Sequence, residues 1–247
     1  MKKKFLCIML LALSTIVANA QECFISDGIN YAIDEEAPSE VYVIPLDDEK
    51  YMGNIVIPAT VQYKDKTYNV TSIGRHSFYN CQGLISIKLP ESITYIGTAA
   101  FQYCKNLSQI ILPSKLDTIK NFAFSYCTKI TKVVIPNSVK TIEASAFSDC
   151  TGLTSVTIGT GLETIDSNTF TQCTALKTIT IPATVKRIKD KAFSGSGLTT
   201  VTFLGKTTQH TDYAFSSTPW FTVNSQRTKD VMKHLGRKIK TRNMVTY

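Results

Sequence analysis

Apolar residues in the middle of this 247-residue chain recur every 23 residues. The phenylalanine column consists of Phe78, Phe101, Phe124, Phe147, Phe170 and Phe193. The isoleucine column consists of Ile73, Ile96, Ile119, Ile142, Ile165 and Ile188. The cysteine column consists of Cys81, Cys104, Cys127, Cys150 and Cys173. A fixed period of roughly 20–50 residues is the signature of a stacked array, so we predict six in-register units.

Each unit predicts two short extended pieces and one turn. The first piece, residues 153–158 in one unit, is rich in β-branched residues and predicts a strand. Proline follows this strand in most units and ends it, because proline cannot donate to a strand ladder. A second extended piece follows, as at 139–142, and Ala-Phe-x-x-Cys then turns the chain, predicted as a single helical or 3₁₀ turn. The predicted fold is a strand-dominated, right-handed parallel stack whose units bury their apolar columns against one another.

Segments that do not repeat are predicted to close both ends of the array. Residues 61–70 read as two strands joined at Lys64-Asp65-Lys66, which predicts an N-terminal β-hairpin cap. At the other end, Phe215 belongs to a degraded copy, and Trp220 is predicted to cover the last rung. Caps are needed because a bare end exposes apolar core and unpaired strand edges. We expect capping strands and the hairpin at 21–72, repeats at 73–215, and a C-terminal cap with a basic tail at 216–247.

The first 20 residues are typical of a secretory signal peptide. Three lysines precede an apolar run at 5–17, and Ala18-Asn19-Ala20 supplies small residues for cleavage before Gln21. The run is too short for a transmembrane segment, and we predict none. A lipoprotein anchor at Cys23 is the alternative, and Glu22 argues against it because a small residue is expected there. The expected location is therefore outside the cell, as a secreted or cell-surface protein of a bacterium.

Charge is unevenly distributed over a chain whose formal net charge is +8. Acidic residues dominate 21–50 and basic residues dominate 221–247. Val231, Leu235 and Ile239 recur at helical spacing, so the tail could form a basic amphipathic helix that contacts anionic surfaces. A solvated chain end is the alternative. Export argues against nucleic acid as the partner.

One charged column is predicted to stabilise the stack. Asp117, Lys140, Glu163 and Lys186 alternate in sign along the period. Vertical neighbours then attract one another, and this sets the register of the rungs modestly.

The repeating unit resembles the BspA-like class of bacterial leucine-rich repeats. The residues that carry the resemblance are Leu89–Gly97 with Ala100, Phe101 and Cys104, and 135–142 with Ala146, Phe147 and Cys150. The segments 27–31 and 67–74 also look like the entry portion of that family, and the likeness covers roughly 24–221. The resemblance implies a leucine-rich-repeat solenoid of the α/β-horseshoe class. It also implies an exported protein that binds host matrix or other proteins, without naming the ligand.

The cysteines and histidines give no strong indication of catalysis, a cofactor or a metal. Zinc sites use close pairs of ligands, whereas one cysteine per rung makes a straight ladder that also suits disulfide geometry poorly. We therefore interpret the column as buried, inert thiols. His76, His210 and His234 lie in no recognisable catalytic motif. We predict no enzymatic activity, no cofactor and no metal.

Positions where the repeat varies are the candidates for partner binding. The candidates are Ile111, Val134, Gln109, Lys132, Tyr103 and Tyr126. Ile111 and Val134 are predicted at outward strand positions of adjacent rungs, and Tyr103 and Tyr126 just before two column cysteines. Exposed apolar and aromatic patches often mark interfaces, and good strand propensity on a pleated surface is an equal alternative.

Three functions follow from these patterns. The first is adhesion to a host matrix protein or cell-surface protein, or to a glycan, through the solenoid surface. The second is a structural or envelope-assembly component without a free ligand. The third, an enzyme, lacks any supporting motif.

Overall fold

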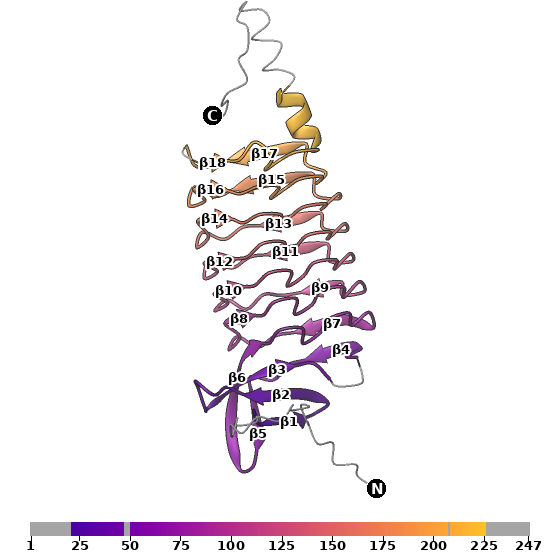
Figure 1. The fold of residues 1–247 in the computed structure, drawn as a ribbon, viewed down its shortest axis with the longest axis vertical. Helices are drawn as coiled ribbons and strands as arrows, with labels where there is room; N and C mark the ends of the chain where they lie inside the picture. Colours follow the sequence, from indigo (N-terminus) through magenta and orange to yellow (C-terminus); the bar gives the residue numbers. More distant parts are fainter. Residues whose placement is uncertain (1–20, 47–49, 207, 226–247) are drawn as a thin grey trace, which may run out of the picture.

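The computed structural model describes residues 21–46, 50–206 and 208–225 of the chain (Figure 1). The predicted signal peptide at 1–20 and the tail from 226 onwards, with the predicted amphipathic helix and His234, lie outside the described residues. The predicted strand-dominated parallel solenoid is confirmed: rungs stack along one axis, and each contributes two short strands on two sides of the stack.

The first row of strands begins after the antiparallel cap and pairs in parallel within two sheets, which are separated between the strands at 141–142 and 164–165. Its members are β6 (Lys66–Ile73), β8 (Tyr95–Ile96), β10 (Thr118–Ile119), β12 (Thr141–Ile142), β14 (Thr164–Ile165), β16 (Arg187–Ile188) and β18 (Gln209–His210). The partners are offset by one repeat, as in Thr118 opposite Thr141 and Ile119 opposite Ile142. The parallel register therefore places the isoleucine column on one inward-facing line.

The second row lies on the other side of each rung. Its members are β4 (Gly53–Val56), β7 (Leu84–Lys88), β9 (Gln109–Ile110), β11 (Lys132–Val134), β13 (Ser155–Thr157), β15 (Thr178–Ile181) and β17 (Thr200–Phe203). Hydrogen bonding divides this row into three sheets, β4-β7-β9, β11-β13 and β15-β17. The ladder is thus interrupted between β9 and β11 and again between β13 and β15.

The Ala-Phe-x-x-Cys segment differs in detail from the predicted helical or 3₁₀ turn. It forms a series of turns with i to i+3 hydrogen bonds, such as Cys104 N–H to Phe101 O at 3.1 Å. Two columns of left-handed residues interrupt any helix. The first column is His76, Ala99, Phe122, Ser145, Asn168 and Lys191. The second is Asn80, Tyr103, Tyr126, Asp149, Gln172 and Gly195. A left-handed residue cannot continue a right-handed helix, so the backbone turns sharply instead.

The same turns also bond from rung to rung. The N–H of Phe101 donates to Ala123 O at 2.7 Å, and the N–H of Phe124 donates to Ala146 O at 2.7 Å. The residue before each phenylalanine is buried against the neighbouring rung, and it is alanine except at Ser77 and Thr169. The Ala-Phe pair of the repeat is therefore both a ladder position and a core position.

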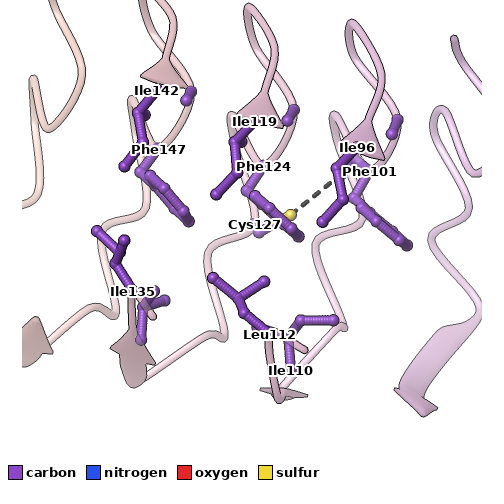
Figure 2. Close-up of a cluster of buried hydrophobic side chains, with 14 of the residues drawn as sticks. Ile96, Phe101, Ile110, Leu112, Ile119, Phe124, Cys127, Ile135, Ile142 and Phe147 are labelled. Carbon is purple, nitrogen blue, oxygen red and sulfur yellow. Dashed lines mark hydrogen bonds between the residues drawn. The ribbon is translucent and has the colours of Figure 1, made fainter. Parts of the chain in front are cut away.

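Stacked phenylalanine rings form the centre of the core (Figure 2). Neighbouring ring centroids are 5.0 Å apart between Phe78 and Phe101, and 5.1 Å between Phe124 and Phe147. Phe215 extends the stack, 5.1 Å from Phe193, which confirms that the degraded copy completes the array. Such offset rings contribute about 0.5–1.5 kcal/mol per pair beyond burial of their area.

The cysteine column is buried beside these rings. Each thiol of the inner rungs donates to the carbonyl of the phenylalanine one rung earlier, as from Cys127 to Phe101 O at 3.1 Å (Figure 2) and Cys104 to Phe78 O at 2.9 Å. Burial raises the pKa of the Cys150 thiol to about 12, and it raises the pKa of Cys127 as well. Among the described residues, no cluster of three or more His, Cys, Asp or Glu side chains could hold a metal.

We expect the column thiols to resist alkylation in the native protein. Because burial raises their pKa values, they stay protonated at neutral and mildly alkaline pH, and the nucleophilic thiolate does not form. Peptide mass spectrometry after iodoacetamide treatment should find these positions unmodified before denaturation and modified after it. Cys23, which is partly exposed, serves as the internal positive control. Rapid native alkylation of any column cysteine would contradict the buried ladder.

Both ends of the stack are covered. At the N-terminal end, β1 (Cys23–Ser26), β2 (Ile29–Ile33) and β3 (Glu40–Ile44) form an antiparallel meander, and β3 then pairs in parallel with β6. The predicted hairpin is confirmed, because β5 (Thr60–Tyr63) pairs antiparallel with β6 around two left-handed residues, Lys64 and Asp65. At the C-terminal end, a short helix at 219–225 seats Trp220 against Phe215 at 4.9 Å. None of the described helices has the length and apolarity needed to cross a membrane.

Candidate functional site

The predicted pair Ile111 and Val134 lies at the first interruption of the second row. Ile111 follows directly after β9 and is 82% exposed, and Val134 ends β11 and is 48% exposed. Gln109 and Lys132 are exposed on the same two rungs. β9 bonds to β7 and β11 bonds to β13, whereas β9 and β11 are not paired. Two apolar side chains therefore project to solvent on either side of a gap in the ladder.

Two further apolar residues are exposed on the second row nearer the N-terminus, where Lys88 lies between Val56 and Ile111 in the outward column. Val56, in β4, pairs with Lys88, which lies one repeat before Ile111, and Ile85 is on the adjacent rung. Both side chains are exposed. We call Val56, Ile85, Ile111 and Val134 the second-row patch. The sequence pattern singled out neither residue. Val56 lies in a rung that departs from the 23-residue spacing, and Ile85 lies in a column that is otherwise polar, with Ser108, Thr131 and Thr154.

Tyr103 and Tyr126 lie in the turns and not on the strands, so they form a separate surface from the second-row patch. Their rings stack at 4.8 Å with an angle of 21° between the ring planes. Tyr79 continues the run in an edge-to-face arrangement, with its ring centroid 5.8 Å from that of Tyr103. We call Tyr79, Tyr103 and Tyr126 the tyrosine ridge. Tyr79 was missed by sequence reasoning, although it stands in a column of small polar residues.

Two of the three ridge tyrosines, Tyr103 and Tyr126, are held in an unfavourable backbone conformation. Tyr103 has φ 63° and Tyr126 has φ 60°, in a column otherwise occupied by Asn80, Asp149, Gln172 and Gly195. Left-handed backbone costs a bulky residue about 1–2 kcal/mol, whereas glycine and asparagine tolerate it. Backbone strain of this kind is concentrated at functional positions. The turn requires the left-handed backbone in every rung, whereas the bulky tyrosine side chain occurs at this position only at Tyr103 and Tyr126.

Charged neighbours give the ridge a defined electrostatic character. The charge of Asp149 raises the pKa of Tyr126, and burial raises the pKa of Asp149. At the other end, the ammonium of Lys50 lies 6.0 Å from the centre of the Tyr79 ring and donates to the Tyr79 carbonyl at 3.2 Å. The ridge therefore runs from a cation at Lys50 to an acid at Asp149.

The first row carries paired charges instead of apolar residues. Lys140 contacts Asp117 at 3.1 Å and Lys186 contacts Glu163 at 2.7 Å, which confirms the predicted attraction along this column. Lys189 and Asp166 add a neighbouring pair at 2.8 Å. Exposed pairs of this kind contribute little to stability, about 0–1 kcal/mol each. The open hollow of about 640 Å³ beside this column is lined mainly by polar and charged residues, and among them Lys140, Glu163, Asp166 and Lys189 already have ion-pair partners.

Comparison with protein families identifies the class of repeat. The family described as "BspA type Leucine rich repeat region" matches residues 60–177 and 96–222 in six copies. The chain belongs to the BspA type leucine-rich repeat family. The resemblance carried by Leu89–Gly97 is therefore confirmed, and BspA-type repeats make up most of the described solenoid.

Solved leucine-rich repeat proteins of bacteria show a similar solenoid. A leucine-rich repeat protein from Bacteroides ovatus is 28% identical with a TM-score of 0.60, over 79% of this chain and 57% of that one. A leucine rich cell surface protein from Faecalibacterium prausnitzii is 25% identical with a TM-score of 0.58, over 74% of this chain and 56% of that one. This chain thus spans little more than half the length of these two relatives.

A third structure is similar in fold alone. The leucine-rich repeat protein of Treponema pallidum is 23% identical with a TM-score of 0.66, over 88% of this chain and 97% of that one. No curated protein matches the chain.

Proposed function

We propose that this BspA-type protein is exported and binds a protein of a host matrix or cell surface. The observation that carries the proposal is the pair of left-handed tyrosines, Tyr103 and Tyr126, in a column otherwise suited to turns. The second-row patch supports it, because Ile111 is far more exposed than core packing would allow. Export is supported by the composition of residues 1–20, and by the cell-surface description of the Faecalibacterium prausnitzii relative.

A protein partner fits the chemistry of these surfaces. Protein interfaces are enriched in tyrosine and in exposed apolar residues, and are depleted of charge at their centres. The rings of Tyr103 and Tyr126 stack on one another. A tyrosine ring combines an apolar surface with a hydroxyl that can donate and accept hydrogen bonds. Affinity would arise from several modest contacts along successive rungs, with a few residues dominating.

Replacing Ile111 and Val134 together by aspartate is expected to weaken binding by at least about tenfold, the factor that corresponds to 1.4 kcal/mol. The aspartates place charges in the centre of the apolar patch and leave the buried columns unchanged. Surface-immobilised matrix proteins and mucins are the binding partners to be screened, with biolayer interferometry as the measurement. The matched control is Thr157→Asp with Thr180→Asp, which adds the same charge to the same outward column of later rungs.

The result distinguishes the two surfaces. Binding that is weakened by the Ile111 and Val134 changes but not by the control pair supports the second-row patch. Binding lost only in Tyr103→Asn with Tyr126→Asn assigns the partner to the ridge alone. If neither pair alters the affinity of a captured protein, the proposed surface is wrong.

The alternative function is a structural or envelope-assembly component. The interrupted second row favours it, because the edges of β9 and β11 are not paired with each other. Concentration-dependent self-association in sedimentation velocity, without capture of any outside protein, would support this alternative. We propose no catalytic role, since the column thiols are buried and protonated.

A further inference from the structure

A small hollow of about 390 Å³ lies on the first row near the N-terminal end of the stack. It is lined by Asp34, Tyr42, Ser72, Gly74, Arg75 and Tyr95, which we call the tyrosine slot. We propose that the tyrosine slot binds one neutral pyranose residue of a glycan. The slot is on the other row from the second-row patch, so this proposal does not rest on the proposed function.

Strand register places the two tyrosines on either side of a small residue. Tyr42 in β3 pairs with Ser72 in β6, and Ser72 pairs with Tyr95 in β8. Two strand spacings separate the tyrosine backbones by about 9.6 Å. The hollow that both tyrosines line lies over Ser72 and Gly74 of the middle rung, and its volume admits one sugar ring in contact with an aromatic side chain.

Aromatic residues occur in this outward column only at the slot. In the following rungs the equivalent positions are Thr118, Thr141, Thr164, Arg187 and Gln209. Threonine suits a pleated surface and needs no ligand. Tyr95, which is 36% exposed, thus departs from the column at the rung beside Tyr42.

The ring of Tyr42 is fixed before any ligand arrives. A Cβ added to Gly74 would lie 2.8 Å from Tyr42 Cδ2 and 2.6 Å from the Val43 carbonyl oxygen, so the ring rests where only glycine leaves room. The side-chain amide of Gln21 donates to the Tyr42 hydroxyl at 2.6 Å. Because the Tyr42 ring is held at both its face and its hydroxyl, it loses little conformational freedom when a ligand binds. This favours affinity.

Polar groups around the slot match the hydroxyls of a neutral sugar. Asp34 accepts from the backbone N–H groups of Glu36 and Ala37 through Oδ1, at 2.9 Å and 3.3 Å, and this orients its carboxylate. In the described parts of the chain, neither Ser72 nor Arg75 has a side-chain hydrogen bond or ion pair. The slot therefore offers a hydrogen-bond acceptor at Asp34 and donors at Arg75 and Ser72. A few such polar groups fix the orientation of a ligand in a pocket whose walls are otherwise aromatic.

The surrounding charge favours a neutral sugar over an acidic one. Asp34 is followed by Glu35 and Glu36, and the strand β3 begins with Glu40. Arg75 is the single cation among the residues that line the slot. A carboxylated or sulfated sugar would be repelled by these acids, whereas a neutral hexose or N-acetylhexosamine would not.

Saturation-transfer NMR with neutral hexoses and N-acetylhexosamines at millimolar concentration tests the proposal on the full protein. At least one of these sugars is expected to receive saturation from the wild-type protein. Tyr95→Thr, which installs the residue of the following rungs, is expected to weaken that sugar's binding by about tenfold or more. The matched control is Tyr79→Thr, the same change at a tyrosine of equal exposure in the ridge, and it should leave sugar binding unchanged.

Each outcome decides for or against the slot. Weaker binding in Tyr95→Thr but not in Tyr79→Thr supports it, and an intermediate loss in Arg75→Gln supports the polar contacts. The proposal is overturned if no neutral sugar receives saturation, or if Tyr95→Thr binds like the wild type. It is also overturned if hexuronic or sialic acids bind more tightly than the neutral sugars.

Discussion

Replacing Phe124 by alanine is expected to lower the free energy of unfolding by about 3–5 kcal/mol. Phe124 is fully buried in the middle of the ring stack, 5.1 Å from Phe101 on one side and 5.1 Å from Phe147 on the other. Alanine would remove both ring contacts and leave a cavity that the rigid rungs cannot close. Phe122→Ala is the matched control, because that ring is 43% exposed and its loss should change stability by less than about 1 kcal/mol.

The same variant should also divide the array. Rungs contact only their immediate neighbours. A cavity in the ring stack therefore weakens the coupling between unfolding of the N-terminal rungs and unfolding of the C-terminal rungs. Trp220, the only tryptophan, packs on the last rung, and its fluorescence reports on the C-terminal half. Circular dichroism reports on all rungs. The two transitions in urea should coincide in the wild type and separate in Phe124→Ala. Coincident transitions with an unchanged midpoint would contradict the central role of the stack.

Gly161→Ala is expected to lower the free energy of unfolding by about 1–3 kcal/mol, the range for overpacking. A Cβ at this position would lie 2.2 Å from the Asn137 carbonyl oxygen and 2.7 Å from that of Val139. Backbone atoms of the previous rung would have to move, and the rungs would separate locally.

Gly205→Ala is the control for this change, because its nearest contact would be 3.1 Å from Ala183 Cα. Thermal unfolding followed by circular dichroism measures both variants. Equal melting temperatures for Gly161→Ala and the wild type would show that these two rungs are not closely packed.

The repeating part of the fold was predictable because the same pattern of apolar residues recurs in six successive units. The phenylalanine and isoleucine columns keep their period, and a side chain that recurs in every rung must face the same interior. The turn conformation was not predictable from the same columns. Tyrosine and lysine rarely adopt a left-handed backbone, so Tyr126 and Lys191 did not predict one. The close packing of successive rungs imposes that conformation on them.

The candidate surfaces were predictable only in part. Ile111 and Val134 are exposed as expected. The missing pairing between β9 and β11 was not predictable, because it concerns backbone hydrogen bonds, which the residue types do not determine. Their role in binding stays a prediction. The tyrosine slot escaped sequence reasoning because Tyr42 lies outside the repeat. Its pairing with Ser72 also follows a register shift between Val41 and Tyr42.

The closed ends have a consequence for how such a protein changes in evolution. Each inner rung bonds to the next through equivalent atoms, and the two caps touch only the outermost rungs. Duplication or loss of a whole 23-residue segment between the caps therefore disturbs neither end. Each added segment would move the helix at 219–225 away from the tyrosine slot by about 4.8 Å. The number of copies thus works as a molecular ruler, and it sets how far apart the two ends are held.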